Sequence, residues 1–381
     1  MATAKTKSAP ASAARKAMHP DQFSFEVPNE PNAEILLESL RSAGYTLEGV
    51  IGDLIDNPID ADATTIVVNM DIDLGTEEWV VEVADDGFGM DGPVLDQMMR
   101  LGSRADHDLD SGLGAFGLGS DTAALAIGRN KHVITKPVPD VALSAMWDLD
   151  VIREAKAFVK HQGDATSDEM ELFEAAFEKG GIPVPEHGTL VRISKCDRIG
   201  GRGIDTAARH VRKYVGRTYR RFLAPNGGLT VVVNGEKVEP IDPTMRHDPD
   251  TQVLLDEPVE FTWKGENGEE ESATVGVTIV HLPDKGGQGP NQAAGITIDS
   301  SGYYIVRNGR EIVAGSTLGL FGRHAEFFQR RNGRRRVGHL VRAGHRQAQP
   351  PQRRVRRLEV EAAALGRGAR DAHAHVAAEA H

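Results

Sequence analysis

Hydrophobic and polar positions change their period along this 381-residue chain. Apolar residues recur three or four positions apart over about residues 46–61, which predicts an amphipathic helix. Short apolar runs rich in valine and isoleucine predict strands. By these patterns we expect further helices at residues 32–43, 167–179 and 204–223, and strands at 65–70, 79–84, 190–193, 229–233, 275–281 and 303–307. The helix at 167–179 is acidic and the one at 204–223 basic, and we expect the charges of both to face solvent.

The helix at 46–61 carries three polar side chains on one face. Asp53, Asn57 and Asp60 are spaced four and three residues apart, while the isoleucines and leucines between them form the apolar side. The Asn57 amide suits Mg²⁺, which takes most of its other ligands from waters and nucleotide phosphates. Asp53, one turn earlier, is placed to orient or deprotonate a water.

The strand at 79–84 runs into a second motif, in which Asp85 is followed by Gly87 and Gly89. Glycines at such a point let the backbone turn sharply or approach a ligand closely. The Asp85 carboxylate could accept a hydrogen bond from the amino group of adenine. Taken alone, this pattern is more often a turn.

Two further motifs follow in the chain. Gly114, Gly117 and Gly119 precede an apolar helical run, and a Gly188-Thr189 step precedes another strand. Glycines that lead into a helix leave backbone N–H groups free for phosphate oxygens, and the helix dipole adds to the attraction. The four motifs in this order predict an ATP site.

Together these residues resemble the GHKL ATPases, the superfamily of gyrase B, Hsp90, MutL and the histidine kinases, and within it the MORC- and MutL-like bacterial ATP-binding proteins. The resemblance covers roughly residues 31–327. It implies an α+β chain in which a Bergerat-type α/β sandwich ATPase domain precedes a smaller α/β transducer-like domain (ribosomal S5 domain 2-like). It also implies ATP and Mg²⁺ as cofactors and an ATP-dependent homodimer.

The resemblance also implies roles for individual residues. Asp53 stands where the family usually has its catalytic Glu, and Asn57 would hold Mg²⁺. The implied nucleotide-binding residues are Asn57, Asp60, Asp85 at adenine, Gly87, Gly89 and Met90 around the base, Gly114, Gly117 and Gly119 in a lid over the phosphates, and Thr189 through a water.

Three positions depart from the family pattern. Asp53 is one methylene shorter than Glu, so we expect slow hydrolysis. Pro58 lies inside the motif helix, where it removes an N–H and costs about 3 kcal/mol if interior. Asp121 follows the lid glycines where many relatives carry a Lys, so we expect it to repel ATP unless it points away.

The chain divides into four predicted segments. Residues 1–30 form a tail, 31–225 the ATP-binding domain, 226–328 an incomplete transducer-like domain and 329–381 an Arg-rich tail. The strand at 229–233 and the Asn-Gly turn after it open the second domain, and another Asn-Gly turn follows the strand at 303–307. In the family this domain senses the γ-phosphate through a Lys, for which no position is predicted here.

Composition narrows the class of protein. With 40% hydrophobic residues the chain has room for two ordinary domains. Its single cysteine, Cys196, excludes an intramolecular disulfide and is expected to be partly buried and unreactive. No apolar run is long enough for a transmembrane helix, and the first 20 residues predict a disordered tail rather than a targeting peptide. We therefore expect a soluble cytoplasmic protein.

The last 53 residues have a composition of their own. They contain 13 Arg, no Lys and 4 acidic residues, and thus carry +9 whereas the rest of the chain carries −21. We expect this segment to bury no core. It is either a basic tail that binds nucleic acid through phosphates or the product of a reading-frame shift in a GC-rich gene. We favour the frame shift, because the family-like sequence stops abruptly at residues 323–328.

The leading hypothesis for function is an ATP-dependent conformational switch. Mg-ATP would order a lid over residues 92–120, where Ser103 and Arg104 are candidate phosphate contacts, and would pair the domain with a second copy. A DNA or protein client in DNA maintenance or defence follows from the MORC- and MutL-like resemblance alone. The alternatives are a nucleotide-binding scaffold without turnover and a histidine-kinase-type phosphotransferase, for whose phosphoacceptor helices residues 1–45 leave little room.

Overall fold

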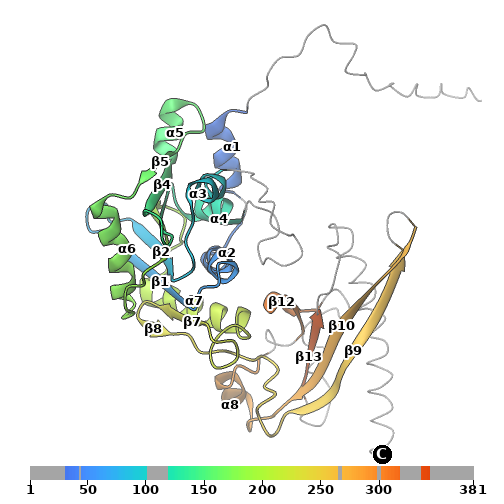
Figure 1. Cartoon of the computed structure of the whole chain (residues 1–381). Coiled ribbons are helices and arrows are strands. Elements are labelled where there is room, and N and C mark those ends of the chain that lie inside the picture. The colour runs from blue at the N-terminus through green and yellow to red at the C-terminus, as the bar shows by residue number, and fades with distance from the viewer. Residues whose placement is uncertain are drawn as a thin grey trace, which may run out of the picture.

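The chain forms two β-sheets, which Figure 1 shows side by side. The computed structural model describes residues 31–42, 44–100, 119–264, 268–297, 302–317 and 336–343. Gly114 and Gly117 of the predicted lid, together with Ser103 and Arg104, lie outside these ranges. The structure therefore describes the other residues of the predicted site.

The first sheet has eight strands in the order β5-β4-β3-β6-β2-β1-β7-β8. Neighbouring strands are antiparallel, except that β1 and β7 run parallel. The strands are β1 (Thr65–Ile72), β2 (Trp79–Asp85), β3 (Asn130–Lys136), β4 (Leu143–Asp148), β5 (His161–Asp164), β6 (Gly188–Cys196), β7 (Thr230–Val233) and β8 (Glu236–Lys237).

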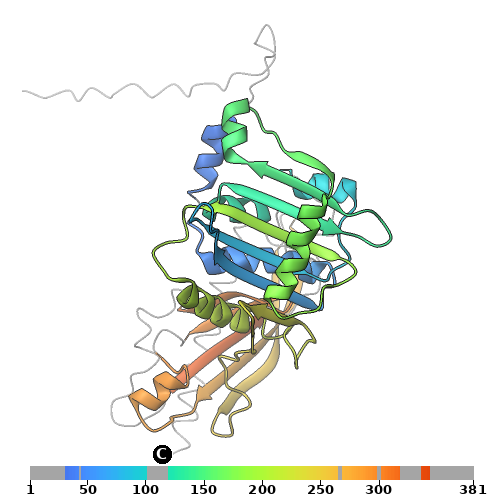
Figure 2. The same cartoon turned by 90° about the vertical axis from the view of Figure 1, so that its left-hand side faces the viewer.

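Helices cover both faces of this sheet, because its strands alternate apolar side chains between the two sides. Ile66 and Val68 of β1 point into the larger core, and Val67 points into the smaller one. Of the described helices, α6 closes the smaller core, and Figure 2 shows it crossing the sheet in front. The larger core is formed with α1 (Ala33–Leu40), α2 (Leu47–Asp60), α3 (Gly92–Met98), α4 (Gly119–Ile127), α5 (Leu149–Ala155) and α7 (Ile204–Thr218), whereas α6 spans Ser167–Lys179.

Helix α2 is the predicted motif helix. It begins after Thr46, whose side chain accepts a hydrogen bond from the Gly49 N–H and so caps the first turn. Pro58 is buried in its last turn, and the helix still continues to Asp60. The missing N–H is the one that would bond the Leu54 carbonyl oxygen, and the helix end is still closed by the Ala61 N–H, which donates to the carbonyl oxygens of Asn57 and Pro58.

Two sequence expectations need correction. The hairpin at 229–237 was assigned to the second domain, but β7 pairs with β1 and so extends the first sheet. The buried valines of this strand would fit either sheet, and only the long-range pairing with β1 shows which sheet the strand joins. Part of the predicted lid loop is helical, since α3 begins at Gly92 with Asp91 as its N-cap.

The second sheet has five strands in the order β12-β11-β13-β10-β9. Its described core is small, consisting of Val280, Leu282 and Ile296 with Met245 packed against them. Strand β13 lies inside the Arg-rich segment, where no core was expected, and pairs with both β10 and β11. The elements are β9 (Gln252–Lys264), β10 (Glu270–Leu282), α8 (Gln288–Ala293), β11 (Tyr303–Arg307), β12 (Arg310–Ser316) and β13 (Arg336–Ala343).

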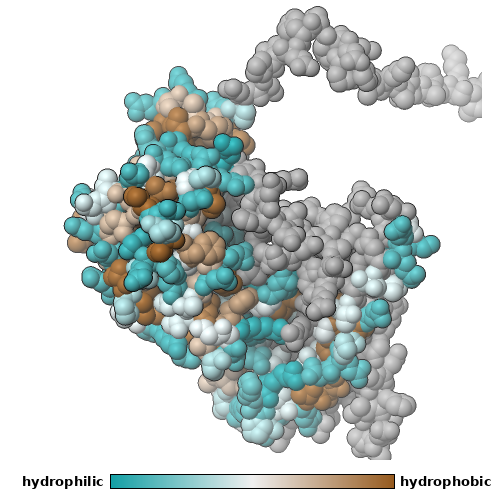
Figure 3. Space-filling view, in the orientation of Figure 1, coloured by the Kyte–Doolittle hydropathy of each residue, from teal (hydrophilic) through white to brown (hydrophobic). Residues whose placement is uncertain are grey.

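The visible surface of the first domain mixes two kinds of residue. Hydrophilic and hydrophobic residues are interspersed over the visible face of the first domain, without one broad apolar area in that view (Figure 3). Among the described helices, none combines the length and the apolar character needed to cross a membrane.

Candidate nucleotide-binding site

The end of β2 places one carboxylate inside the first domain. Asp85 is 4% exposed, and its strand is paired with β1 on one side and β6 on the other. The Gly87 N–H donates a hydrogen bond of 2.9 Å to Asp85 Oδ1. Burial raises the pKa of Asp85 to about 7, against the lowering effect of that N–H. The side chain is thus a buried acceptor that gains from a further donor.

The glycines around Asp85 allow close packing of the protein's own backbone. Gly89 has φ +74°, and a Cβ there would lie 2.8 Å from the Lys136 carbonyl oxygen. Gly188 has φ +146°, and a Cβ there would lie 1.9 Å from the Asp85 carbonyl oxygen. A side chain at Gly188 would force β6 away from β2, and one at Gly89 would force the loop after β2 away from the end of β3. Contact of Gly87 and Gly89 with a nucleotide stays a prediction.

Two residues beside Asp85 were not predicted from the sequence. The Thr135 hydroxyl lies 3.1 Å from the Thr189 hydroxyl and accepts a hydrogen bond from the Met90 N–H. His187 Nδ1 lies 2.7 Å from the Gly87 carbonyl oxygen. The position of His187 next to Gly188 was an available signal, whereas Thr135 ends a strand without any motif. Predicted residues Thr189 and Met90 therefore meet through Thr135.

The helix motif and the Asp85 motif lie next to each other. The Phe88 N–H donates to the carbonyl oxygen of Ala61, the residue that caps α2. A Cβ on Gly87 would lie 2.9 Å from the same oxygen. The C-terminal end of α2 is thus joined directly to the loop that follows β2.

The three polar residues of α2 differ in their surroundings. Asn57 and Asp60 are exposed, and the Asn57 side chain makes no hydrogen bond to another described residue. Its amide oxygen fits the hard-donor preference of Mg²⁺. The described residues contain no group of three His, Cys, Asp or Glu side chains that could hold a metal. A Mg²⁺ ion at Asn57 would therefore take most of its ligands from phosphates and water.

Asp53 is partly buried and paired. Arg310, at the start of β12, places Nη2 3.2 Å from Asp53 Oδ1 and Nε 2.8 Å from Asp56 Oδ1. Burial raises the pKa of Asp53, and the Arg310 charge and a hydrogen bond with Tyr45 lower it. Burial likewise raises the pKa of Asp56, to about 6. Nothing in the local sequence signals Arg310, because it follows an ordinary Asn-Gly turn.

The side chain of Asp121, which the sequence predicts to repel ATP unless it points away, is turned into the core. Its side chain is 2% exposed, and its Oδ1 lies 2.5 Å from Nζ of Lys131, which is fully buried. Lys131 also donates to the Ser120 hydroxyl. The carboxylate therefore points into the core, where an ammonium group offsets its charge. This pair fixes the first turn of α4, which directly follows the predicted lid.

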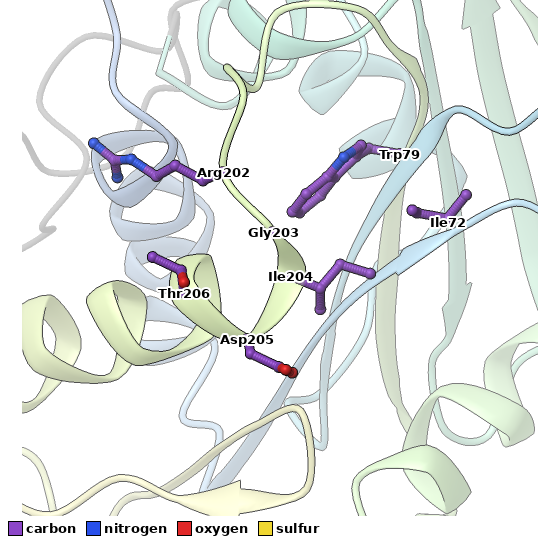
Figure 4. A pocket seen from close by; sticks show the side chains of 7 residues that line it. All are labelled: Ile72, Trp79, Arg202, Gly203, Ile204, Asp205 and Thr206. Atoms are coloured by element: carbon purple, nitrogen blue, oxygen red, sulfur yellow. The ribbon is translucent and has the colours of Figure 1, made fainter.

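The described pockets lie away from these residues. One of about 500 Å³ is shown in Figure 4, where Trp79 and Ile72 face the first turn of α7. Trp79 begins β2 and Asp85 ends it, so this pocket is at the opposite end of the strand. A second pocket, of about 370 Å³, is lined in part by Ile59 and Phe222. Neither contains a predicted nucleotide-binding residue.

A family model matches part of the first domain. Residues 45–176 match the family model of histidine kinase-, DNA gyrase B-, and HSP90-like ATPases. No curated protein gives a significant match to the chain. The matched segment contains Asp53, Asn57 and Asp85 and ends before Thr189. The family match and the mixed eight-stranded sheet together support a GHKL-type ATP-binding domain in this chain.

Proposed function

We propose that this protein binds Mg-ATP and hydrolyses it slowly, and that the cycle drives a conformational switch. The observation that carries the proposal is the buried Asp85 carboxylate, whose neighbouring loop contacts the end of the α2 helix. Besides the Gly87 N–H, the amino group of adenine would give this buried carboxylate a further donor.

The α2 face would act at the other end of the nucleotide. Asn57 would hold Mg²⁺, which offsets negative charge that develops on the phosphates. Asp60, one turn further along the exposed side, would bind through the same hydrated ion. Asp53 would orient a water for attack on the γ-phosphate. The N–H groups at the start of α4, which opens with Gly119, would donate hydrogen bonds to phosphate oxygens.

A second candidate function is nucleotide binding without turnover. The shorter Asp53 side chain favours it, because it would hold the attacking water less well. A histidine-kinase-type phosphotransferase is a lesser alternative that shares the same fold of the nucleotide domain.

The proposed switch is an ATP-dependent pairing of two copies, with the second sheet in the position of a transducer-like domain. ATP can favour the paired state only through its higher affinity for that state. A role in DNA maintenance or defence rests on the resemblance to MORC- and MutL-like proteins.

The proposal is tested by measuring ATP binding and hydrolysis with and without Mg²⁺. Asn57→Ala should lose Mg²⁺-dependent turnover, and the exposed amide variant Gln162→Ala serves as its control. Binding without turnover in the unmodified protein would favour the scaffold. A protein that binds no ATP under either condition would refute the proposal.

A further inference from the structure

One arginine links the two sheets at the proposed site. Arg310 opens β12 of the second sheet, yet its guanidinium reaches two carboxylates of α2, one of them 257 residues away in the sequence. The β11–β12 hairpin that carries Arg310 turns at Asn308 and Gly309. Because Arg310 follows this turn and reaches α2, the tip of the hairpin lies against the first domain.

The guanidinium is held from several sides. It bridges Asp53 and Asp56 through different nitrogens, and its Nε also lies 3.3 Å from the Tyr219 hydroxyl. That hydroxyl lies 2.7 Å from both Asp56 Oδ1 and the Gly52 carbonyl oxygen. The Arg310 charge also lies 5.8 Å from the centre of the Tyr219 ring. A planar fork of this kind fixes the direction of its carboxylate partners.

Neighbouring contacts keep the hairpin in place. Glu311, which is buried, accepts hydrogen bonds from Arg217 at 2.7 Å and from Arg220 at 2.5 Å. Gly309 lies directly against the Phe222 ring, with φ +85° and no room for a side chain. The docking of Arg310 is therefore part of a buried contact rather than a single exposed ion pair.

We propose that Arg310 is a positioning residue of the ATPase site, through which the second sheet sets the orientation of Asp53. The inference rests on the proposed function, because it concerns the carboxylate that would orient the attacking water. Without Arg310, Asp53 can choose among rotamers on the helix face, and a small displacement of a catalytic group is costly. The Arg310 charge also opposes the effect of burial on the pKa of Asp53, and so favours the ionised side chain.

The test compares three variants of the full chain. Arg310→Gln removes the charge, and we expect kcat to fall roughly tenfold to a hundredfold while the Kd for ATP stays within about twofold. Arg310→Lys keeps the charge but cannot present two nitrogens in a plane, so we expect an intermediate kcat. Arg246→Gln removes a comparable pair with Asp256 in the second sheet, and it should match the unmodified protein.

The possible results distinguish the inference about Arg310 from the proposed ATPase function. An unchanged or raised kcat in Arg310→Gln, with ATP still bound, overturns the inference and leaves the proposed function standing. An unmodified protein that binds ATP without turnover also overturns the inference, since Asp53 then activates no water. Failure to bind ATP refutes the proposed function itself. If Arg310→Gln does not fold, Arg310→Lys carries the comparison, and a kcat equal to that of the unmodified protein overturns the inference.

Discussion

The two ends of the candidate site are built in different ways. At Asp85 the site is made by neighbouring strands, and its contacts join residues of β2, β3 and β6 within one sheet. At Asp53 it is made by side chains that cross between two sheets, with Arg310 from β12 and Tyr219 from the end of α7. The strand end is fixed by the backbone, whereas the helix end depends on how the second sheet is docked.

This difference separates two properties that an ATP-dependent switch needs. A backbone-built pocket can bind a nucleotide in either state of the switch, because hydrogen-bonded strands do not readily rearrange. Ion pairs across a domain contact can exist in two arrangements and so can respond to the nucleotide. We therefore expect changes at Asp85 to affect binding and changes at Asp53 to affect turnover.

The largest expected effect is the loss of turnover in Asp53→Ala. Removing the group that orients water should lower kcat by about 10²- to 10⁴-fold and leave ATP affinity nearly unchanged. Steady-state kinetics and equilibrium binding on the same preparation measure both quantities. Asp168→Ala, which removes an exposed carboxylate on α6, is the control. Loss of ATP affinity in Asp53→Ala would erase the distinction between the two ends.

Lys131→Met tests the buried pair that fixes the start of α4. Asp121 would keep its charge in the core without its ammonium partner, and we expect a loss of about 3–5 kcal/mol in the free energy of unfolding. Lys179→Met removes an exposed partner of Glu82, which retains Arg192, and should cost less than about 1 kcal/mol. Denaturant unfolding of both variants measures the difference, and equal losses would contradict the buried pairing.

Asp85→Asn should weaken ATP binding by about 10- to 100-fold, the loss expected for one hydrogen bond to a charged group. The amide is nearly the same size, so the strands should stay in place. Isothermal titration of ATP gives the affinity, and Asp168→Asn on α6 is the matched control. Unchanged affinity in Asp85→Asn would place adenine elsewhere and remove the strand end from the site.

The smallest effect is a dependence of ATP affinity on pH. The pKa of Asp85 is raised to about 7 by burial, and adenine would bind the ionised form. Affinity should rise as the pH increases through about 7, and fall by up to about tenfold per pH unit below it. The stability of the folded protein without nucleotide depends on pH in the opposite sense. Because the pKa of Asp85 is raised in the folded state, its protonated side chain stabilises the fold at low pH, and this contribution is lost as the pH rises through about 7. Titrations of Asp85→Asn provide the control, since ATP's own protonation affects both proteins. The same slope in both would exclude Asp85 as the source.

Local sequence was sufficient for much of the fold. The residue spacing that predicted the motif helix is realised in α2, with Thr46 as its cap, and the Asn308-Gly309 turn joins two strands as expected. These features depend on neighbours a few residues apart. The assignment of β7 failed because a strand of buried valines carries no information about which sheet it joins. The fate of Asp121 also depended on a distant partner, Lys131 on β3.

For the candidate site, the sequence by itself determined which residue types lie on the polar face of α2 and after β2, because helix period and strand ends are local properties. Tertiary structure alone decided that Thr135 contacts Thr189, the β6 partner of Asp85, and that Arg310 holds Asp53. Contacts of that kind form between segments that are far apart in the sequence, and only packing brings their side chains within hydrogen-bond distance.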